Sequence, residues 1–295
     1  MARGCNQAGY TILEVMMFLA VTSVLFVGAM NSINGRQQAV QFSQSTRDMQ
    51  SRIQQLINSV SSGFYPNSNN YTCAVPNRTT PTSRPTFDST TPSIQGSSND
   101  CVFLGKILHL AVQDTGNTGT AYETISVAGR RLNASANAQE VSSLAEAIPT
   151  AVVGSGVEAV EPDTLQFGLR VTKVIDGSPS SSTTYGSIAF FSTLPRFIGG
   201  SSNLISGSQR VSFGGVPSTA LNETRATAVS AINAITDSAT PPSGVTPINM
   251  NPRDGIIICL RDTTNRKAMI TIGGANSQAR ATLETGTLYN TSKCG

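Results

Sequence analysis

The sequence contains no tryptophan and a single histidine, and only 13% of its 295 residues are charged. A single histidine excludes a metal site built from several histidines and leaves any catalytic triad with one candidate base, His109. The low charge argues against a charge-rich disordered tail, a coiled coil and a protein that coats nucleic acid. The net charge of +3 is too small for the whole chain to attract a polyanion.

Motifs for nucleotide binding, zinc proteolysis and hydrolysis by a serine nucleophile are also missing. The sequence has no P-loop, Rossmann fingerprint, HExxH or GxSxG. His109 lies in the apolar run ILHLAV, which favours a half-buried structural histidine over a catalytic one. No CxxC spacing occurs among the cysteines, so the metal interpretation of these residues is weak. We therefore expect neither an enzyme nor a protein with a bound cofactor or metal.

The first thirty residues differ from everything that follows. A short polar segment, MARGCNQAG, precedes residues 10–30, a run of 21 residues with one charged side chain, Glu14. About 20 apolar residues are enough to cross a bilayer as a helix. A secretory signal peptide is the alternative, but it has a shorter apolar core and a small-residue cleavage site after it, which this run lacks. We expect a membrane-spanning helix.

Gly9 is followed by the segment YTILEV, with Glu14 at its fifth position, and this pattern resembles the cleavage and methylation motif of type IV prepilins. In that family a membrane peptidase cuts after the glycine and methylates the new N-terminus, usually a phenylalanine. The resemblance implies a leader at residues 1–9, a new terminus at Tyr10, and a Glu14 carboxylate that meets the Tyr10 amine of a neighbouring subunit. Tyr10 in place of phenylalanine and a leader with one basic residue, Arg3, depart from the usual pattern.

The same resemblance implies a structural subunit of a surface filament, most simply a minor pilin or pseudopilin. Its partners would be prepilin peptidase, other pilin subunits bound through the N-terminal helix, and an inner-membrane assembly platform. The chain would cross the cell membrane once, with its head outside the cytoplasm, before entering the filament. Pilus, type II secretion and competence systems all stay open. A subunit whose head binds DNA or an adhesion target is the alternative, and a membrane-anchored surface enzyme is a third, weaker one.

The apolar run is expected to continue as an amphipathic helix. Residues 37–60 contain no proline or glycine, and apolar side chains recur there at helical spacing on one stripe, formed by Met49, Ile53, Leu56, Ile57 and Val60. Asn31, Asn34 and Gly35 are weak helix formers, which would allow a local break between the two parts. The helix should end near Gly63, because glycine commonly terminates helices.

The rest of the chain reads as a loop-rich β head, so the predicted fold class is α+β with a long N-terminal helix packed on that head. The predicted organisation is a leader at 1–9, the helix at 10–62 and the head at 63–295. An irregular loop is predicted over residues 64–100. Strands are predicted at 101–112, 122–127, 165–171 and 188–191, a hairpin over 254–272, helices at 138–147 and 218–236, and loops at 177–184 and 198–208.

Four cysteines remain once the leader is removed. On the outer side of a membrane they suggest two disulfides with three possible connectivities. We favour Cys73 with Cys101 and Cys259 with Cys294, because each pair closes a local segment.

The last 43 residues carry six basic and three acidic side chains. Arg261, Arg266, Lys267 and Arg280 make a candidate basic patch. Some pilin-like proteins of the DNA-uptake class bind DNA with a basic C-terminal patch, which would make DNA a partner. A solvated hairpin face is the simpler interpretation, and no interleaved aromatic residues support stacking on single strands.

The resemblance to prepilins predicts where the mature chain begins. Gly9 separates the polar leader from the apolar run, so the mature protein should start at Tyr10 with a methylated amine. Mass spectrometry of the N-terminal peptide from membrane and filament fractions checks this. A dominant peptide that begins at Met1, or beyond Met30, would contradict it.

Overall fold

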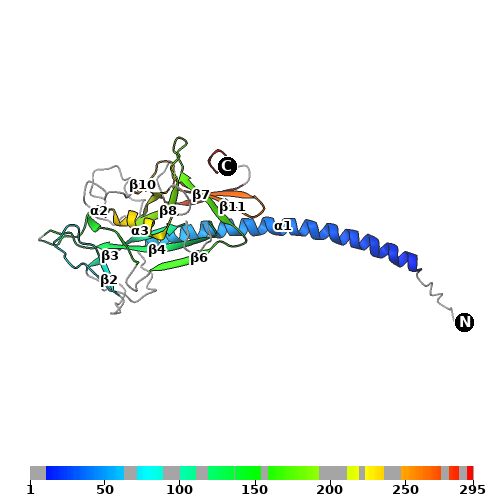
Figure 1. The fold of residues 1–295 in the computed structure, drawn as a ribbon, viewed down its shortest axis with the longest axis horizontal. Coiled ribbons are helices and arrows are strands. Elements are labelled where there is room, and N and C mark those ends of the chain that lie inside the picture. The colour runs from blue at the N-terminus through cyan, green and yellow to red at the C-terminus, as the bar shows by residue number, and fades with distance from the viewer. Residues whose placement is uncertain are drawn as a thin grey trace. The chain divides into compact units, whose positions relative to one another are not determined.

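The computed structural model describes residues 11–62, 72–88, 100–110, 119–135, 137–153, 159–192, 211–218, 223–235, 247–273, 279–285 and 291–294. The chain divides into two compact units, residues 1–44 and residues 45–295. One long apolar helix near the N-terminus and a head of antiparallel sheets make the fold α+β, as predicted (Figure 1).

Helix α1 (Ile12–Ser61) is 50 residues long and includes all of the predicted apolar run after Thr11. The first proline of the chain is Pro66, so no residue before it lacks the backbone N–H that a helix needs. The helix continues through Asn31, Asn34 and Gly35, and the local break that these residues would allow is absent. A glycine costs a helix only about 1 kcal/mol relative to alanine, which is too little to interrupt it between good helix formers.

Within the head unit, residues 45–61 of α1 pack through one buried stripe. The large apolar side chains of this stripe are those predicted, and each stabilises the folded head by about 2 kcal/mol when it leaves water. Ser45 and Thr46 extend the stripe at its beginning, and the Ser45 hydroxyl donates a hydrogen bond of 2.9 Å to the carbonyl of Gln166. The buried members are Ser45, Thr46, Met49, Ile53, Leu56, Ile57 and Val60.

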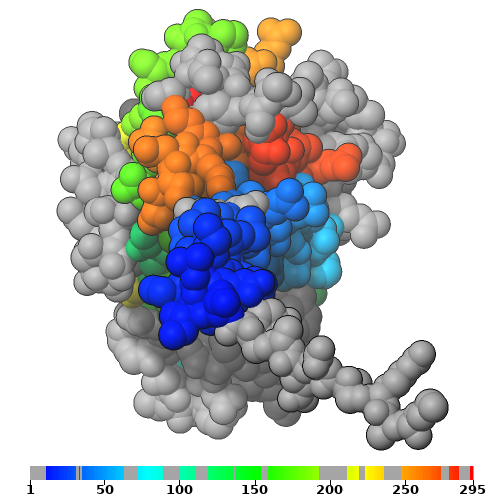
Figure 2. Space-filling model, turned by 90° about the vertical axis from the view of Figure 1, so that its right-hand side faces the viewer, coloured from blue at the N-terminus to red at the C-terminus, as the bar shows by residue number. Residues whose placement is uncertain are grey.

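Two glutamines of α1 bind the open edge of strand β13 (Ala281–Thr285). Gln50 Nε2 donates to the carbonyl of Ala281 over 3.1 Å, and the Ala281 N–H donates to Gln54 Oε1 over 3.2 Å. Figure 2 shows this part of α1, in lighter blue, directly beside β13, in red. The two side chains supply the hydrogen bonds that a further strand would otherwise make at this residue.

The larger sheet has seven strands in the order β10-β9-β8-β3-β4-β5, with β6 also paired to β4, and all pairings are antiparallel. All ten residues of β4 are buried, and β3 is buried from Phe103 onward, because both faces of the sheet are covered. The strands are β3 (Cys101–His109), β4 (Ala121–Arg130), β5 (Thr150–Ala151), β6 (Val160–Thr164), β8 (Tyr185–Ser192), β9 (Val211–Pro217) and β10 (Asn249–Met250).

Alternation along β3 and β4 distributes their side chains between the two faces. Leu108 and Thr124 line a groove together with Ile53 and Leu56 of α1. The neighbouring Ile107 and Ile125 belong to the main apolar core on the other face, with Ile232 of α3 (Arg225–Asn233) and Ala147 of α2 (Leu144–Ala147). The sheet is therefore packed between α1 on one face and the two short helices on the other.

Helix α3 is fixed to the sheet by an ion pair at its first turn. Arg225 Nε and Nη2 donate to the two carboxylate oxygens of Glu123 on β4, both over 2.8 Å. The Glu123 side chain is only 4% exposed, so this bidentate pair lies where solvent screens it little.

The smaller sheet has the order β13-β12-β11-β7 and contains the predicted hairpin, with β7 (Arg170–Asp176), β11 (Ile256–Arg261) and β12 (Lys267–Ile272). Asp262 shapes the hairpin turn: its carboxylate accepts hydrogen bonds from the backbone N–H groups of Thr264 and Arg266, at 2.9 and 2.7 Å. A short helix, α4 (Thr291–Cys294), follows the sheet near the C-terminus.

A buried polar cluster joins the two sheets. Asp176 at the end of β7 accepts hydrogen bonds from the Tyr185 hydroxyl of β8, at 3.1 Å, and from the Asn249 amide of β10, at 3.2 Å. Burial raises the pKa of Tyr185 to about 12, and the nearby Asp176 carboxylate adds to the rise. Tyr185 therefore keeps its proton near neutral pH and donates a hydrogen bond to Asp176.

The predicted strand at residues 165–171 is wrong over most of its length. Residues 165–169 form the turn between β6 and β7, and Phe167 and Gly168 adopt left-handed backbone conformations with φ of 55° and 69°. Gly168 adopts this conformation without strain because it has no Cβ. The Phe167 side chain is half exposed. Four alternating apolar residues suggested the strand, Leu165, Phe167, Leu169 and Val171; of these, Leu169 and Val171 are buried, and Val171 alone lies in β7.

Other boundaries also differ from the prediction. The proposed loop at 64–100 contains the antiparallel pair β1 (Thr72–Ala74) and β2 (Thr86–Asp88). The predicted helix at 138–147 shortens at its start to α2, because Ala138 has positive φ and Glu140 forms a β-bridge with Leu132. The helix at 218–236 shortens to α3. The strands at 101–112, 122–127 and 188–191 are confirmed as β3, β4 and β8 with shifted ends. Residues 63–71, 89–99, 111–112, 219–222 and 236 and the predicted loop at 198–208 lie outside the described residues.

Candidate functional site

The N-terminal part of α1 exposes an unusual amount of apolar surface. Its large apolar side chains are 47–82% exposed from Ile12 to Ile33. Soluble proteins rarely leave more than a few hundred Å² of contiguous apolar surface in water. Among the described residues, α1 is the one helix that is long and apolar enough to cross a membrane, and none of its most apolar window is buried.

The hydroxyl groups inside this apolar run bond to the helix itself. Thr22 Oγ1 donates to the carbonyl of Phe18 over 2.9 Å, and Ser23 Oγ donates to the carbonyl of Leu19 over 2.7 Å. These bonds satisfy the two hydroxyls without water, which is the arrangement that a hydrocarbon environment requires.

Glu14 lies in the first turn of α1 and is exposed. Its backbone N–H donates to Thr11 Oγ1 over 3.3 Å, so Thr11 and Glu14 have the spacing of a capping box. A carboxylate at this position also interacts favourably with the positive end of the helix dipole. Gly9 and Tyr10 lie outside the described residues, and the ion pair between Glu14 and a Tyr10 amine stays a prediction.

The candidate basic patch is only partly assembled. Arg261 and Lys267 lie directly opposite each other on β11 and β12, and Arg266 belongs to the turn that joins these strands. Arg280 precedes β13 at the other end of β12, because its carbonyl accepts a hydrogen bond from Gly273 N–H. The patch of four residues therefore divides into a group of three and a separate arginine.

Sequence reasoning missed the contribution of β7 to this surface. Arg170 is paired with Arg261 in register, so Arg170, Arg261 and Lys267 form a row across three adjacent strands, which we call the cation row. Arg170 is exposed, and Arg261 and Lys267 are partly exposed. Like charges directly opposite each other destabilise a sheet. No signal in the sequence placed Arg170 here, because residues 165–171 were predicted to be a strand but its pairing partner could not be predicted.

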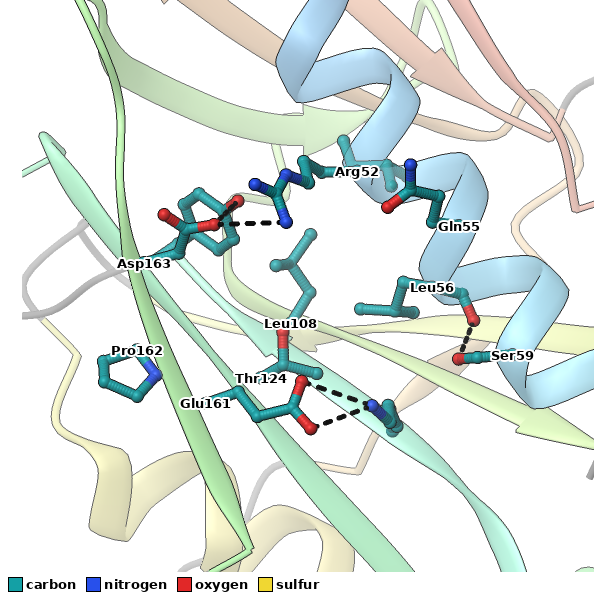
Figure 3. Close-up of a pocket in the computed structure, with 12 residues that line it drawn as sticks. Arg52, Gln55, Leu56, Ser59, Leu108, Thr124, Glu161, Pro162 and Asp163 are labelled. Carbon is teal, nitrogen blue, oxygen red and sulfur yellow. Dashed lines mark hydrogen bonds and ion pairs between the residues drawn. The ribbon is translucent and has the colours of Figure 1, made fainter. Parts of the chain in front are cut away.

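A groove of about 350 Å³ lies between α1 and strands β3, β4 and β6 (Figure 3). Two ion pairs cross it: Lys106 Nζ with Glu161 at 3.5 Å, and Arg52 with Asp163 at 3.9 Å. Asp163 also accepts a hydrogen bond of 2.8 Å from the Tyr122 hydroxyl, and burial, followed by this bond, raises the pKa of Tyr122. The charges of the groove are engaged with one another, so they fasten β6 to α1 and to the sheet.

Strand β6 carries both acids of the groove on either side of Pro162. Glu161 reaches across the sheet to Lys106, and Asp163 reaches to α1. Proline has no backbone N–H to offer a further strand, so β6 makes a poor partner for edge-to-edge pairing.

His109, Glu123 and Ser187 lie on one cross-strand row of the larger sheet, a combination that nucleophilic hydrolases also use. His109 Nδ1 and Ser187 Oγ are 2.8 Å apart. The three residues are 1%, 3% and 0% exposed, and Glu123 is engaged by Arg225. The hydroxyl is not open to a substrate here, and His109 is fully buried instead of half buried.

The cysteines lie in the pairs that the sequence favoured. The Cα atoms of Cys73 and Cys101 are 6.1 Å apart, and those of Cys259 and Cys294 are 5.6 Å apart, with each pair joined as a disulfide. The first disulfide links β1 to the start of β3, and the second ties α4 to β11. Among the described residues, no three histidine, cysteine, aspartate or glutamate side chains gather as a metal site.

No protein-family model, curated protein or solved structure matches this chain. The residues themselves therefore carry the functional argument.

The two disulfides generate a prediction about stability. They close segments of 28 and 35 residues, and each should contribute about 2–4 kcal/mol to the free energy of unfolding. We expect the Cys73→Ser/Cys101→Ser variant and the Cys259→Ser/Cys294→Ser variant each to unfold at a lower temperature than the wild type. Circular dichroism of the full chain in detergent measures this.

A reducing agent supplies the control, since it should lower the wild-type transition and leave the variant lacking all four cysteines unchanged. Four free thiols in non-reducing peptide maps of exported protein would contradict the pairing.

Proposed function

We propose that this chain is a type IV pilin-like structural subunit, made as a membrane-anchored precursor and assembled into a surface filament through its N-terminal helix. The observation that carries the proposal is the exposed apolar part of α1, which contains the single acid Glu14 and follows the Gly9-Tyr10 junction. A leader, a cleavage glycine and a glutamate five residues later are the pattern that this chain shares with type IV prepilins.

Two alternative environments can cover this apolar surface. A bilayer covers it in the isolated subunit, because residues 10–30 match the thickness of the hydrocarbon core. A bundle of identical helices covers it in a filament. Transfer from the first environment to the second is favourable only if helix packing replaces what the lipid provided.

Glu14 distinguishes these two environments. Near the end of a membrane span, a carboxylate can reach water or headgroups, and its cost is moderate. Inside a packed bundle, it needs a positive partner, and the amine of Tyr10 from a neighbouring subunit has the required charge. The pair would thereby set the axial position of each new subunit against the preceding one.

Within the head unit, the last part of α1 is held firmly against the sheets. Residues 45–61 of α1 are held by an apolar stripe, by Gln50 and Gln54 on the edge of β13, and by Arg52 on Asp163. These contacts give Gln50, Arg52 and Gln54 a structural role on this stretch of helix.

We predict that Glu14→Gln and Glu14→Leu insert into the membrane and are cleaved normally but enter filaments poorly. Glu14→Gln keeps the side-chain volume and the spacing of the capping box, so its defect would isolate the lost charge. Immunoblots of sheared-filament and membrane fractions measure the distribution of subunit between them.

The matched control is Asp48→Asn, which neutralises an exposed carboxylate on the same helix outside the apolar run. It should reach filaments at wild-type levels. Normal filament levels for both Glu14 variants would remove Glu14 from assembly and leave it as a helix-capping residue.

The cation row favours a second candidate function, a filament subunit whose head binds DNA. The three cations lie on adjacent strands, whose backbones are about 4.8 Å apart in a sheet. Cations on neighbouring strands can neutralise successive phosphates of one nucleic-acid backbone. Asp262, the residue after Arg261, accepts hydrogen bonds within the hairpin turn. Six carboxylates of the described head form ion pairs elsewhere, at Asp48, Asp100, Glu123, Glu140, Glu161 and Asp163.

For this second function, the double variant Arg170→Gln/Arg261→Gln should bind duplex DNA more weakly than the wild type. The weakening should be the same for every DNA sequence, because the lost contacts are to phosphates. The slope of log affinity against log salt should fall by about 1 for each phosphate contact removed. Electrophoretic mobility shifts of the full chain in detergent measure both quantities.

Arg280→Gln removes one charge from the same sheet at the opposite end of β12 and serves as the control. Equal weakening by Arg280→Gln, or no DNA binding by the wild type at low salt, would leave only the structural role.

A further inference from the structure

Glu223 is a buried acid for which the described structure provides no partner. Its side chain belongs to a residue that is only 6% exposed, and neither carboxylate oxygen has a hydrogen-bond donor within reach. Buried carboxylates are normally paired or hydrogen-bonded, because an ionised group loses several kcal/mol of hydration when it is enclosed. An unpartnered one is therefore stable in this position as the neutral acid.

The sheet has a specific space for this side chain. Glu223 lies across Gly186 of β8, and a methyl group at Gly186 would collide with the Glu223 carboxyl group and Cβ. Gly186 also lies at a register irregularity between β8 and β9, and its carbonyl accepts the Leu110 N–H over 3.1 Å. The absence of a side chain at Gly186 is what allows the carboxyl group to reach the sheet.

The groups around Glu223 do not supply a counter-charge. Arg225, two residues further along, is engaged with Glu123 of β4. His109 of β3 is bonded to Ser187 of β8, and the Tyr185 hydroxyl is directed to Asp176 and Asn249. The described residues of β9 contain no titratable side chain. Burial alone raises the pKa of Glu223 to about 7, and no neighbouring charge contributes to the shift.

We propose that Glu223 is a proton-dependent latch, which holds the start of α3 against β8 as the neutral acid and releases it on ionisation. Thr224, the residue that precedes α3, makes no side-chain cap bond, so the latch acts at an end of the helix that lacks this bond. The bidentate Arg225–Glu123 pair lies just beyond it and acts as the pivot.

The direction of the pH effect follows from the two protonation states. The pKa of Glu223 is higher in the folded chain, at about 7, than its ordinary value of 4.5. The contribution of the latch is therefore complete below pH 4.5 and is lost as the pH rises through about 7. The start of α3 should be closed in acid and open in mild alkali.

Hydrogen exchange of the full chain in detergent micelles tests the latch. Peptides covering β8 and α3 are compared at about pH 5.5 and about pH 8, after correction for the intrinsic pH dependence of exchange. We expect wild-type protection in these peptides to fall by about tenfold at the higher pH. Glu223→Gln cannot ionise and should keep similar protection at both values.

Two further variants complete the test. Glu140→Gln neutralises an exposed acid of the head and should behave as the wild type. Gly186→Ala should displace Glu223 and lower protection at both pH values. The latch would be overturned if the wild type were equally protected at both pH values, or if Glu223→Gln lost as much protection as the wild type. These two proteins decide the test even if Gly186→Ala does not fold.

Discussion

The structure depends on a single constraint: one helix has two kinds of surface, and each requires a different partner. From Ile12 to Ile33 the apolar side chains of α1 have no protein cover, whereas from Ser45 to Val60 one stripe is fully enclosed by the head. The hydrophobic effect favours burial of both parts, but the head buries only the second. The proposed function begins from the exposed part, which the chain itself leaves uncovered.

The sequence predicted the features that depend on one period or on local chemistry. Spacing alone predicted the apolar run, the buried stripe of α1 and the hairpin that begins at Ile256. For the cysteines, the preference for pairs that close local segments selected the connectivity that is found. The strand through residues 165–171 was predicted wrongly, because alternating apolar residues were counted without regard to Gly168, which permits the left-handed turn found there. The length of helix α2 was overestimated at its start, since helix propensity cannot reveal the positive φ of Ala138 or the β-bridge between Leu132 and Glu140.

The features that could not be predicted are those created by non-local register. Arg170 joins Arg261 only because β7 pairs with β11, and a bulge between Cys259 and Leu260 brings the two arginines opposite each other. Glu223 meets Gly186 only because α3 folds back onto the larger sheet. Neither contact produces a periodic pattern in the sequence, so neither could be predicted from it.

Strand β6 has a consequence for contacts between one head and another. Exposed strands at the edges of sheets pair readily with those of neighbouring molecules, and such pairing propagates into insoluble aggregates. Pro162 leaves a gap in the hydrogen-bonding edge of β6, and the flanking Glu161 and Asp163 bring charge to the same edge. At β13 the glutamines of α1 occupy Ala281 instead. Pairing of one head with another through these two edges is thus discouraged, which keeps the open sides of both sheets from serving as sites of unintended association.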